Sequence, residues 1–137
     1  MDVRDTRWVA LVIEEMVPAI LRRGFNGLFL DTLDNPPELE RRDPVGNAGM
    51  TQAAARLVKA LKLHWPQVPI ILNRGYELLD SVARDIDHVL GESVYADYDF
   101  ETKTYGKVPE PLYKWQVETL QRAQMSNPAL SVLTLDY

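Results

Sequence analysis

GFNGLFLDTLDN, residues 24–35, is the stretch from which the fold can be read. The apolar run Leu28–Leu30 leads directly into Asp31, and a second carboxylate, Asp34, follows three residues later. A short apolar run of this kind is typical of a strand that is buried on both faces. Its end in an acid has two explanations: an ordinary turn after a buried strand, or a strand that carries a carboxylate to a working surface.

Outward from this segment, helical and strand patterns alternate along the whole chain. Four helices are expected, at 6–23, 51–65, 76–85 and 111–125. Four strands are expected, at 27–31, 69–73, 88–93 and 129–137. This α-β-α-β-α-β-α-β order is typical of a parallel sheet with crossover helices. Residues 1–137 show no internal domain boundary and are expected to form a single domain.

Three local features qualify this pattern. Pro18 lies inside the first helix and is expected to remove a hydrogen bond or to kink it. Thr51 is the expected cap of the second helix. Residues 32–50 form a long polar connection, and residues 94–111 form an aromatic and acidic segment that is expected to be irregular.

The composition excludes several classes of protein. The chain has 137 residues, of which 46% are hydrophobic, so it can bury a core. Its net charge is −5 and its Lys and Arg residues are scattered, so no nucleic-acid partner is expected. No apolar run reaches the roughly 20 residues of a membrane span, and residues 1–8 lack the features of a signal peptide. The chain has no cysteine, which excludes disulfides and thiolate chemistry.

Each of the four expected strands ends in a polar residue. These residues are Asp31, Asn73, Glu92 and Asp136. In parallel α/β folds, ligands bind at the carboxyl ends of the strands, so the four side chains are candidates for one site. Because side chains alternate along a strand, Phe29 is expected to share the inward face with Asp31.

Several polar residues at or just after the strand ends also have a purely structural explanation. Asp34 and Asn73 are followed by turn-forming residues and could bond nearby amides, and Asp136 lies next to the last residue of the sequence. Glu92 is harder to explain in this way, because glutamate is seldom buried unless it is paired or used. Two carboxylates at neighbouring strand ends suit glycoside hydrolysis, in which one protonates the leaving oxygen and the other attacks or activates water.

Aromatic and histidine residues add less. Tyr95, Tyr98 and Tyr105 follow the third strand and could stack on a sugar ring or join the core. His64 and His88 have no partner at ligand spacing, so neither a metal nor a cofactor is expected. The alternative function is a small doubly wound binding or signalling domain that holds Mg²⁺ on its strand-end acids. No strand ends in lysine and no glycine-rich phosphate loop follows a strand, which disfavours that alternative.

Four motifs, taken in order, resemble a known family. GFNGLFLDTLDN (24–35), PIILNRGYELL (69–79), VLGESVYADYD (89–99) and VLTLDY (132–137) are similar to glycoside hydrolase family 114, the endo-α-1,4-polygalactosaminidase-like TIM barrels. The resemblance covers nearly the whole chain. Asn26 stands where many members have Asp, at a position that precedes the first strand.

The resemblance implies a fold, a reaction and a set of site residues. The implied reaction is endo-acting, retaining hydrolysis of a galactosamine-rich polysaccharide, with Asp31 as nucleophile and Glu92 as general acid/base. An acidic cleft would suit a polymer with free amines. The cleft would be lined by Asp2, Arg4, Asp34, Asn73, Tyr95, Tyr98, Asp136 and Tyr137. The family also implies an extracellular or periplasmic location, although the chain shows no signal peptide and a cytoplasmic location stays open.

The length of the chain departs from the family. A TIM barrel takes about 250 residues, and the chain has 137. The expected fold is therefore a partial (β/α)8 barrel of four parallel strands, with the N-terminal strands and the last strand absent. Its open sheet edges would favour self-association. An inactive fragment of the hydrolase fold is the third alternative.

Overall fold

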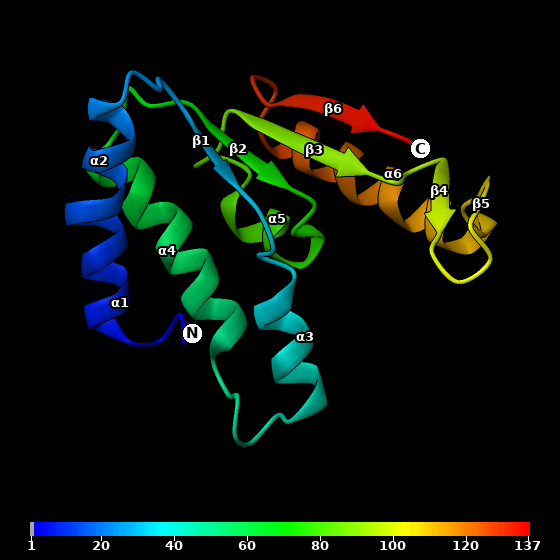
Figure 1. Ribbon diagram of the computed structural model, residues 1–137, viewed down its shortest axis with the longest axis horizontal. Helices are drawn as coiled ribbons and strands as arrows, with labels where there is room; N and C mark the ends of the chain where they lie inside the picture. Colours follow the sequence, from blue (N-terminus) through cyan, green and yellow to red (C-terminus); the bar gives the residue numbers. More distant parts are fainter. Residues whose placement is uncertain (1) are drawn as a thin grey trace.

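The computed structural model describes residues 2–137 and contains a four-stranded parallel sheet with helices along it (Figure 1). The strands are β1 (Leu28–Leu30), β2 (Ile70–Asn73), β3 (His88–Glu92) and β6 (Ser131–Leu135). They lie in the order β1-β2-β3-β6, and each neighbouring pair is parallel. The predicted partial barrel sheet is confirmed.

The doubly wound alternative is wrong for this sheet. A doubly wound fold reverses its strand order at a switch point and places helices on both faces. Here the strand order follows the chain, and α4, α5 and α6 all lie on one side of the sheet (Figure 1). No helix within residues 2–137 is long and apolar enough to cross a membrane.

The helices cover one face of the sheet and leave the other exposed. Their bounds are α1 (Thr6–Leu11), a π-helical turn (Val12–Met16), α2 (Val17–Arg22), α3 (Asn35–Arg42), α4 (Met50–His64), α5 (Tyr76–Val82) and α6 (Glu110–Ser126). Ile70, Leu72 and Val89 face the helices and are fully buried. Phe29 and Leu133 point to the opposite face and are 54% and 45% exposed. The core therefore lies between the sheet and its helices.

The first helix runs past its proline without a break. Asp5 caps it by accepting a hydrogen bond from the Arg7 N–H. A π-helical turn then precedes α2, which has Pro18 in its first turn. Proline has no N–H to donate to the preceding turn, and the wider π-helical turn lies at the point where the regular α-helical hydrogen bonding is interrupted. Gly24 follows the helix with a φ of 92°, a backbone conformation that suits glycine.

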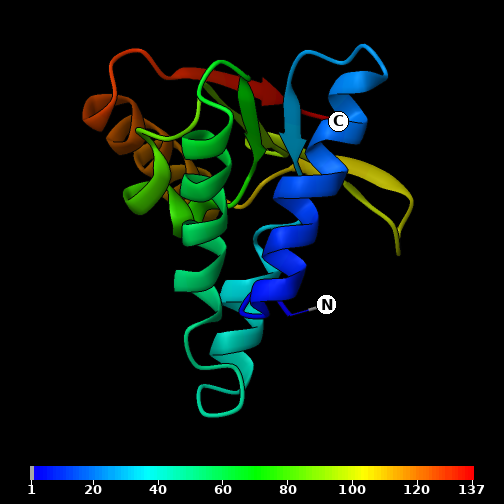
Figure 2. The same cartoon turned by 90° about the vertical axis from the view of Figure 1, so that its left-hand side faces the viewer.

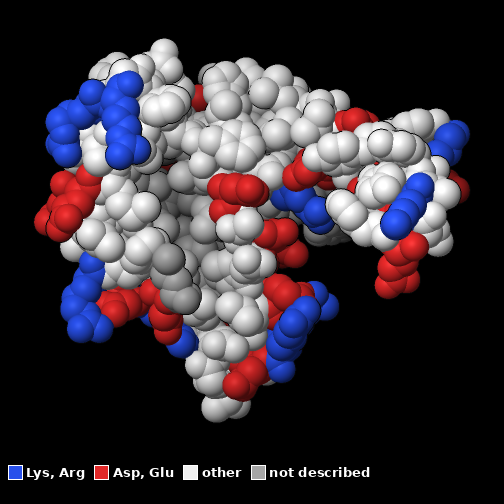
Figure 3. Space-filling view, viewed as in Figure 1, with Lys and Arg blue, Asp and Glu red and all other residues white. Residues whose placement is uncertain are grey.

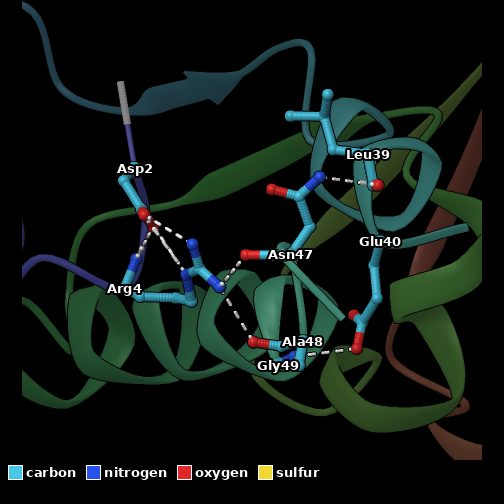
Figure 4. Close-up of polar contacts among 8 residues, drawn as sticks. Asp2, Arg4, Leu39, Glu40, Asn47, Ala48 and Gly49 are labelled. Atoms are coloured by element: carbon cyan, nitrogen blue, oxygen red, sulfur yellow. Dashed lines mark hydrogen bonds and ion pairs between the residues drawn. The ribbon is translucent and has the colours of Figure 1, made fainter. Parts of the chain in front are cut away.

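Three predictions about local structure are wrong. The connection 32–50 contains α3, and the segment 94–111 contains an antiparallel hairpin of β4 (Ala96–Asp99) and β5 (Thr104–Lys107). Thr51 does not cap α4. The Glu40 carboxylate on α3 accepts from the N–H groups of Gly49 and Thr51 instead, at 2.8 Å each (Figure 4 draws the Gly49 bond). A side chain from a neighbouring helix supplies this cap, so local sequence did not indicate it.

Candidate active site

One asparagine joins the two candidate catalytic carboxylates. The Asn73 amide nitrogen donates to Asp31 Oδ1 at 2.9 Å and to Glu92 Oε2 at 3.0 Å. An amide NH₂ has two hydrogens, and here both are used on carboxylates. Asn73 is 7% exposed, so the bridging amide is shielded from water. Three of the four polar strand ends therefore meet at one point, on three adjacent strands.

The backbone turns sharply just after each of these three residues. Thr32, Arg74 and Ser93 have φ values of 61°, 54° and 54°. Residues other than glycine seldom adopt this left-handed conformation, which costs on the order of 1–3 kcal/mol and clusters at functional sites. Its repetition at three equivalent positions is not a local accident. The turns end the strands abruptly and leave the bridging side chains at the rim of the sheet.

Glu92 has two donors on its carboxylate. The Tyr137 hydroxyl donates to Oε1 at 2.5 Å, and Asn73 donates to Oε2. These hydrogen bonds, the Tyr137 bond first, lower the pKa of Glu92 below its ordinary 4.5, and the nearby charge of Arg74 acts in the same direction. The same contact raises the pKa of the Tyr137 hydroxyl. Glu92 is therefore ionised at neutral pH in the free site.

A buried network fixes the backbone beside Glu92. The Tyr76 hydroxyl on α5 donates to Gln116 Oε1 on α6 at 2.8 Å, and the Gln116 amide donates to the carbonyl of Ser93 at 3.2 Å. Burial raises the pKa of Tyr76 to about 12, so it remains a donor. The Ser93 hydroxyl continues the network to Asp97 at 2.8 Å. Glu92 is thus positioned by two helices that sequence reasoning did not connect to it.

A hollow opens beside Glu92. It has a volume of about 470 Å³, and its lining includes Arg74, Glu92, Asp97, Tyr98, Phe100, Tyr105 and Tyr137. The Tyr98 ring packs edge-on against Phe100, with centroids 4.9 Å apart, and lies 5.0 Å from Tyr105. Figure 3 shows acidic side chains gathered in the middle of this face, near the ends of β1 and β2. The hollow combines a carboxylate with an aromatic wall.

Asp31 faces a different hollow from Glu92. Its hollow of about 610 Å³ lies between the first helix and β1 and has a mostly apolar lining that includes Trp8, Met16 and Phe29. Asp31 also accepts from the Thr32 N–H at 2.8 Å. Asp34 is not part of the bridge, because it precedes α3 as its N-cap residue and makes no side-chain capping bond. The two aspartates therefore occupy different settings, Asp31 at the end of β1 and Asp34 at the start of α3.

Two predicted lining residues hold the hairpin instead of the bridge. Asp136 Oδ1 accepts from the backbone N–H groups of Tyr95 and Ala96 at 2.6 and 3.0 Å. The Tyr95 ring packs edge-on against Tyr113, and the Lys107 ammonium lies 5.0 Å from its centroid. Both residues are close to the site in the chain, and their contacts fix the base of the β4–β5 hairpin.

Asp2 makes its side-chain contacts with Arg4 and none with the carboxylate bridge. Its side chain pairs with Arg4, whose guanidinium also donates to the carbonyls of Gly46 and Ala48 at 3.1 Å each (Figure 4). The Arg4 bond lowers the pKa of Asp2 to about 2. Asp2 and Arg4 tie the N-terminal segment to the connection between α3 and α4. Their predicted place in the cleft is not supported by any contact with the bridge.

Only weak sequence signals marked the functional residues that were missed. Arg74 and Asp97 line the Glu92 hollow, and both stand within quoted motifs, next to or near a predicted site residue. Gln116 is 2% exposed on α6. In the sequence, however, it reads like any polar residue on the surface of a helix. Among residues 2–137, no group of three His, Cys, Asp or Glu side chains is arranged to hold a metal ion.

The fold and the bridge together define a class. Four parallel strands of a partial α/β barrel carry two carboxylates at the ends of β1 and β3, on either side of Asn73 on β2, and a pair of carboxylates at strand ends suits glycoside hydrolysis. The chain matches glycoside hydrolase family GH114 over residues 1–137, and it belongs to this family.

Solved structures agree with this assignment. The glycoside hydrolase domain of PelA from Pseudomonas aeruginosa matches with a TM-score of 0.81 and 26% identity, over 100% of this chain and 52% of that one. A glutamate-to-alanine variant of that domain matches with a TM-score of 0.80 and the same identity and coverage. The chain thus spans about half the length of these relatives. No curated protein matches it.

Proposed function

We propose that this chain carries the catalytic half of an endo-acting glycosidase that cleaves galactosamine-containing polysaccharide. The observation that carries the proposal is the Asn73 bridge, which brings the Asp31 and Glu92 carboxylates to one point at the rim of the sheet. Membership of the GH114 family supports the reaction class. The substrate is proposed on the family resemblance, and so is an extracellular or periplasmic location.

The spacing of the two carboxylates supports a retaining mechanism. The oxygens that accept from Asn73 lie no farther apart than the two bond lengths of 2.9 and 3.0 Å taken together. This short separation of the nearest oxygens is compatible with the roughly 5–5.5 Å between the carboxyl groups of retaining enzymes. In a retaining reaction, one carboxylate bonds to the anomeric carbon and the other transfers the proton.

We assign Asp31 as the nucleophile and Glu92 as the general acid/base. The lowered pKa of Glu92, caused first by Tyr137, suits the second step, in which the ionised carboxylate takes a proton from water. The first step needs a protonated Glu92. A bound sugar that displaces the Tyr137 or Asn73 donor would remove interactions that favour the ionised form.

The Glu92 hollow supports an amino-sugar subsite. Tyr98, Phe100 and Tyr105 supply aromatic faces, and a ring face attracts a cation such as a protonated amine. Glu92 and Asp97 add negative charge on the same wall. Arg74 contributes a single opposing charge, which would sit best near a hydroxyl or an N-acetyl carbonyl of the sugar.

The experiment replaces the acid without changing its shape. In a protein that contains the complete barrel, Glu92→Gln is expected to reduce hydrolysis of a galactosamine polymer by about 10³-fold or more, because proton transfer is lost. Glu118→Gln, an exposed residue on α6, is the matched control and should retain wild-type turnover. Wild-type turnover in Glu92→Gln, with the fold intact by circular dichroism, would overturn the proposal.

Azide rescue separates the two roles. An alanine at the acid/base position leaves the nucleophile intact, so azide should yield a glycosyl azide of retained configuration from an activated substrate. An alanine at the nucleophile position lets azide attack directly, so the product should be inverted. We expect retention for Glu92→Ala and inversion for Asp31→Ala. The opposite result would show that the two roles are exchanged.

A further inference from the structure

The β4–β5 hairpin has two faces of different chemistry. Side chains alternate along a strand, and residues paired across an antiparallel hairpin lie on the same face. One face is polar and consists of two cross-strand pairs, Asp97 with Gly106 and Asp99 with Thr104. Tyr98 and Tyr105 pair on the other face, which is aromatic and lines the Glu92 hollow. The hairpin stands out from the sheet and its helices in both views (Figure 1 and Figure 2).

The polar face lines a second hollow, between the hairpin and the start of α6. We call it the hairpin hollow; its volume is about 420 Å³, and its lining includes Asp97, Asp99, Thr104, Gly106, Lys107 and Leu112. Glu92 lines the aromatic hollow but not this one. A group bound in the hairpin hollow would therefore lie beside the reacting centre and not at the bond that is cleaved.

The two hollows adjoin each other, because both are lined by Arg74, Ser93 and Asp97. The Ser93 hydroxyl and the Tyr98 N–H both donate to Asp97 Oδ1, at 2.8 Å each. No hydrogen bond within residues 2–137 involves Asp97 Oδ2. This oxygen can therefore accept from a ligand that passes from one hollow into the other.

A glycine on the polar face keeps the hairpin hollow open. Apart from its chain neighbours, no heavy atom lies within 4 Å of a Cβ placed on Gly106. The φ angle of Gly106 is not positive, so its backbone does not require a glycine. A side chain at this position would instead occupy the space beside Asp97, its cross-strand partner.

We propose that the hairpin hollow is a subsite for a further sugar of the same polysaccharide, on a polymer chain that continues from the Glu92 hollow over their shared residues. The inference rests on the proposed function and names the surface that holds a sugar away from the cleaved bond. Asp99 offers acceptors and Lys107 offers a donor, which suits the hydroxyl and amino groups of a sugar. Binding at such a remote subsite favours a long substrate over a short one.

Filling the hollow tests the proposal. In a protein that contains the complete barrel, Glu92→Gln blocks cleavage, and calorimetry measures the Kd for a galactosamine hexasaccharide. Adding Gly106→Leu should raise this Kd by about 10-fold or more, since one hydrogen bond to a charged group is worth that much. Adding Glu101→Leu is the matched control. It puts the same side chain at the exposed turn of the hairpin, outside both hollows, and should leave the Kd unchanged.

Asp99→Asn tests the same hollow without added bulk. Asparagine keeps an oxygen that can accept from the N–H groups of Glu101 and Thr102, so the hairpin turn is preserved while the charge is lost. The Kd should rise in this variant as well. An unchanged Kd in both Gly106→Leu and Asp99→Asn would overturn the subsite and leave the proposed function standing. A parent protein that binds no hexasaccharide would overturn the proposed substrate, and the subsite with it.

Discussion

An acidic residue lies at each end of β3, and the two carboxylates have different hydrogen-bond partners and different roles. Asp87, just before the strand, accepts from Lys62 at 2.9 and 3.1 Å and from the Ile70 N–H at 2.8 Å. Glu92, at the other end, has no cation within ion-pair distance among the described residues and accepts from Asn73 and Tyr137. One acid is neutralised by a charge and the backbone, and the other is held by neutral donors that a substrate can replace.

This difference in partners distinguishes a carboxylate that stabilises the fold from one that is a candidate for catalysis. Burial pushes the pKa of Asp87 upward, but the Lys62 and Ile70 contacts outweigh it and hold the pKa below the ordinary 3.8. Asp87 thereby locks α4 and β2 to the start of β3. Glu92 shares its amide donor with a second carboxylate, and the negative charge of Asp31 acts on Glu92 to raise its pKa. Such an arrangement is costly for stability and useful for catalysis.

The largest expected effect is at the other end of the bridge. Asp31→Asn should reduce turnover in the complete barrel by about 10³-fold or more, because the nucleophile is lost. Asp34→Asn should reduce it by less than about 10-fold, since Asp34 makes no contact with the bridge. Steady-state kinetics on the same polymer measures both. If Asp34→Asn proves the more damaging, the two aspartates have been assigned in reverse.

Asn73→Ala tests the bridge itself. Losing a hydrogen bond to a charged group costs about 1.5–3 kcal/mol, which is roughly a 10–100-fold fall in turnover. The pKa of Glu92 should rise, because a donor that lowers it is removed. Asn127→Ala is the matched control, since Asn127 bonds only the Ala83 carbonyl and its own turn. Equal turnover in the two variants would show that the bridge is purely structural.

Asp87→Ala should change stability and leave chemistry alone. The buried Ile70 N–H loses its carboxylate acceptor, so the free energy of unfolding should fall by about 1–3 kcal/mol at pH 7. Asp87 has a lowered folded pKa, so its contribution is present above the unfolded value of 3.8 and is lost as pH falls through the folded value. Urea titrations should show that the difference in unfolding free energy between wild type and Asp87→Ala is smaller below pH 3 than at pH 7. Asp80→Ala, whose partner Arg122 lies 3.9 Å away at the surface, should change little at either pH.

The smallest expected effect is that of Tyr137→Phe on the pKa of Glu92. Removing the hydroxyl should move the Glu92 pKa upward toward 4.5, because this hydrogen bond is the largest cause of its lowered value. A carboxyl-carbon NMR titration of Glu92 measures the shift. Tyr113→Phe, which alters a ring packed against Tyr95, should leave the titration unchanged. An unmoved Glu92 titration in Tyr137→Phe would show that the contact is not formed in solution.

Much of the fold followed from local pattern. Four apolar runs that alternate with helical segments predicted the sheet, and the structure confirms its parallel order. The failures lay where tertiary contacts replace local signals. The cap of α4 comes from Glu40 on another helix. The β4–β5 hairpin forms from a polar segment whose base is tied to Asp136, far along the chain.

The site followed a similar division. Asp31, Asn73 and Glu92 were visible as polar ends of apolar strands, because the period of side chains along a strand is a local property. The sequence by itself determined which residue types stand at the rim. Only the tertiary structure decided that one amide serves both carboxylates, that Tyr137 reaches Glu92, and that Asp136 accepts from the N–H groups at the base of the hairpin. Hydrogen bonds depend on distances of a few ångströms between strands, and those distances are set by the register and packing of the whole sheet.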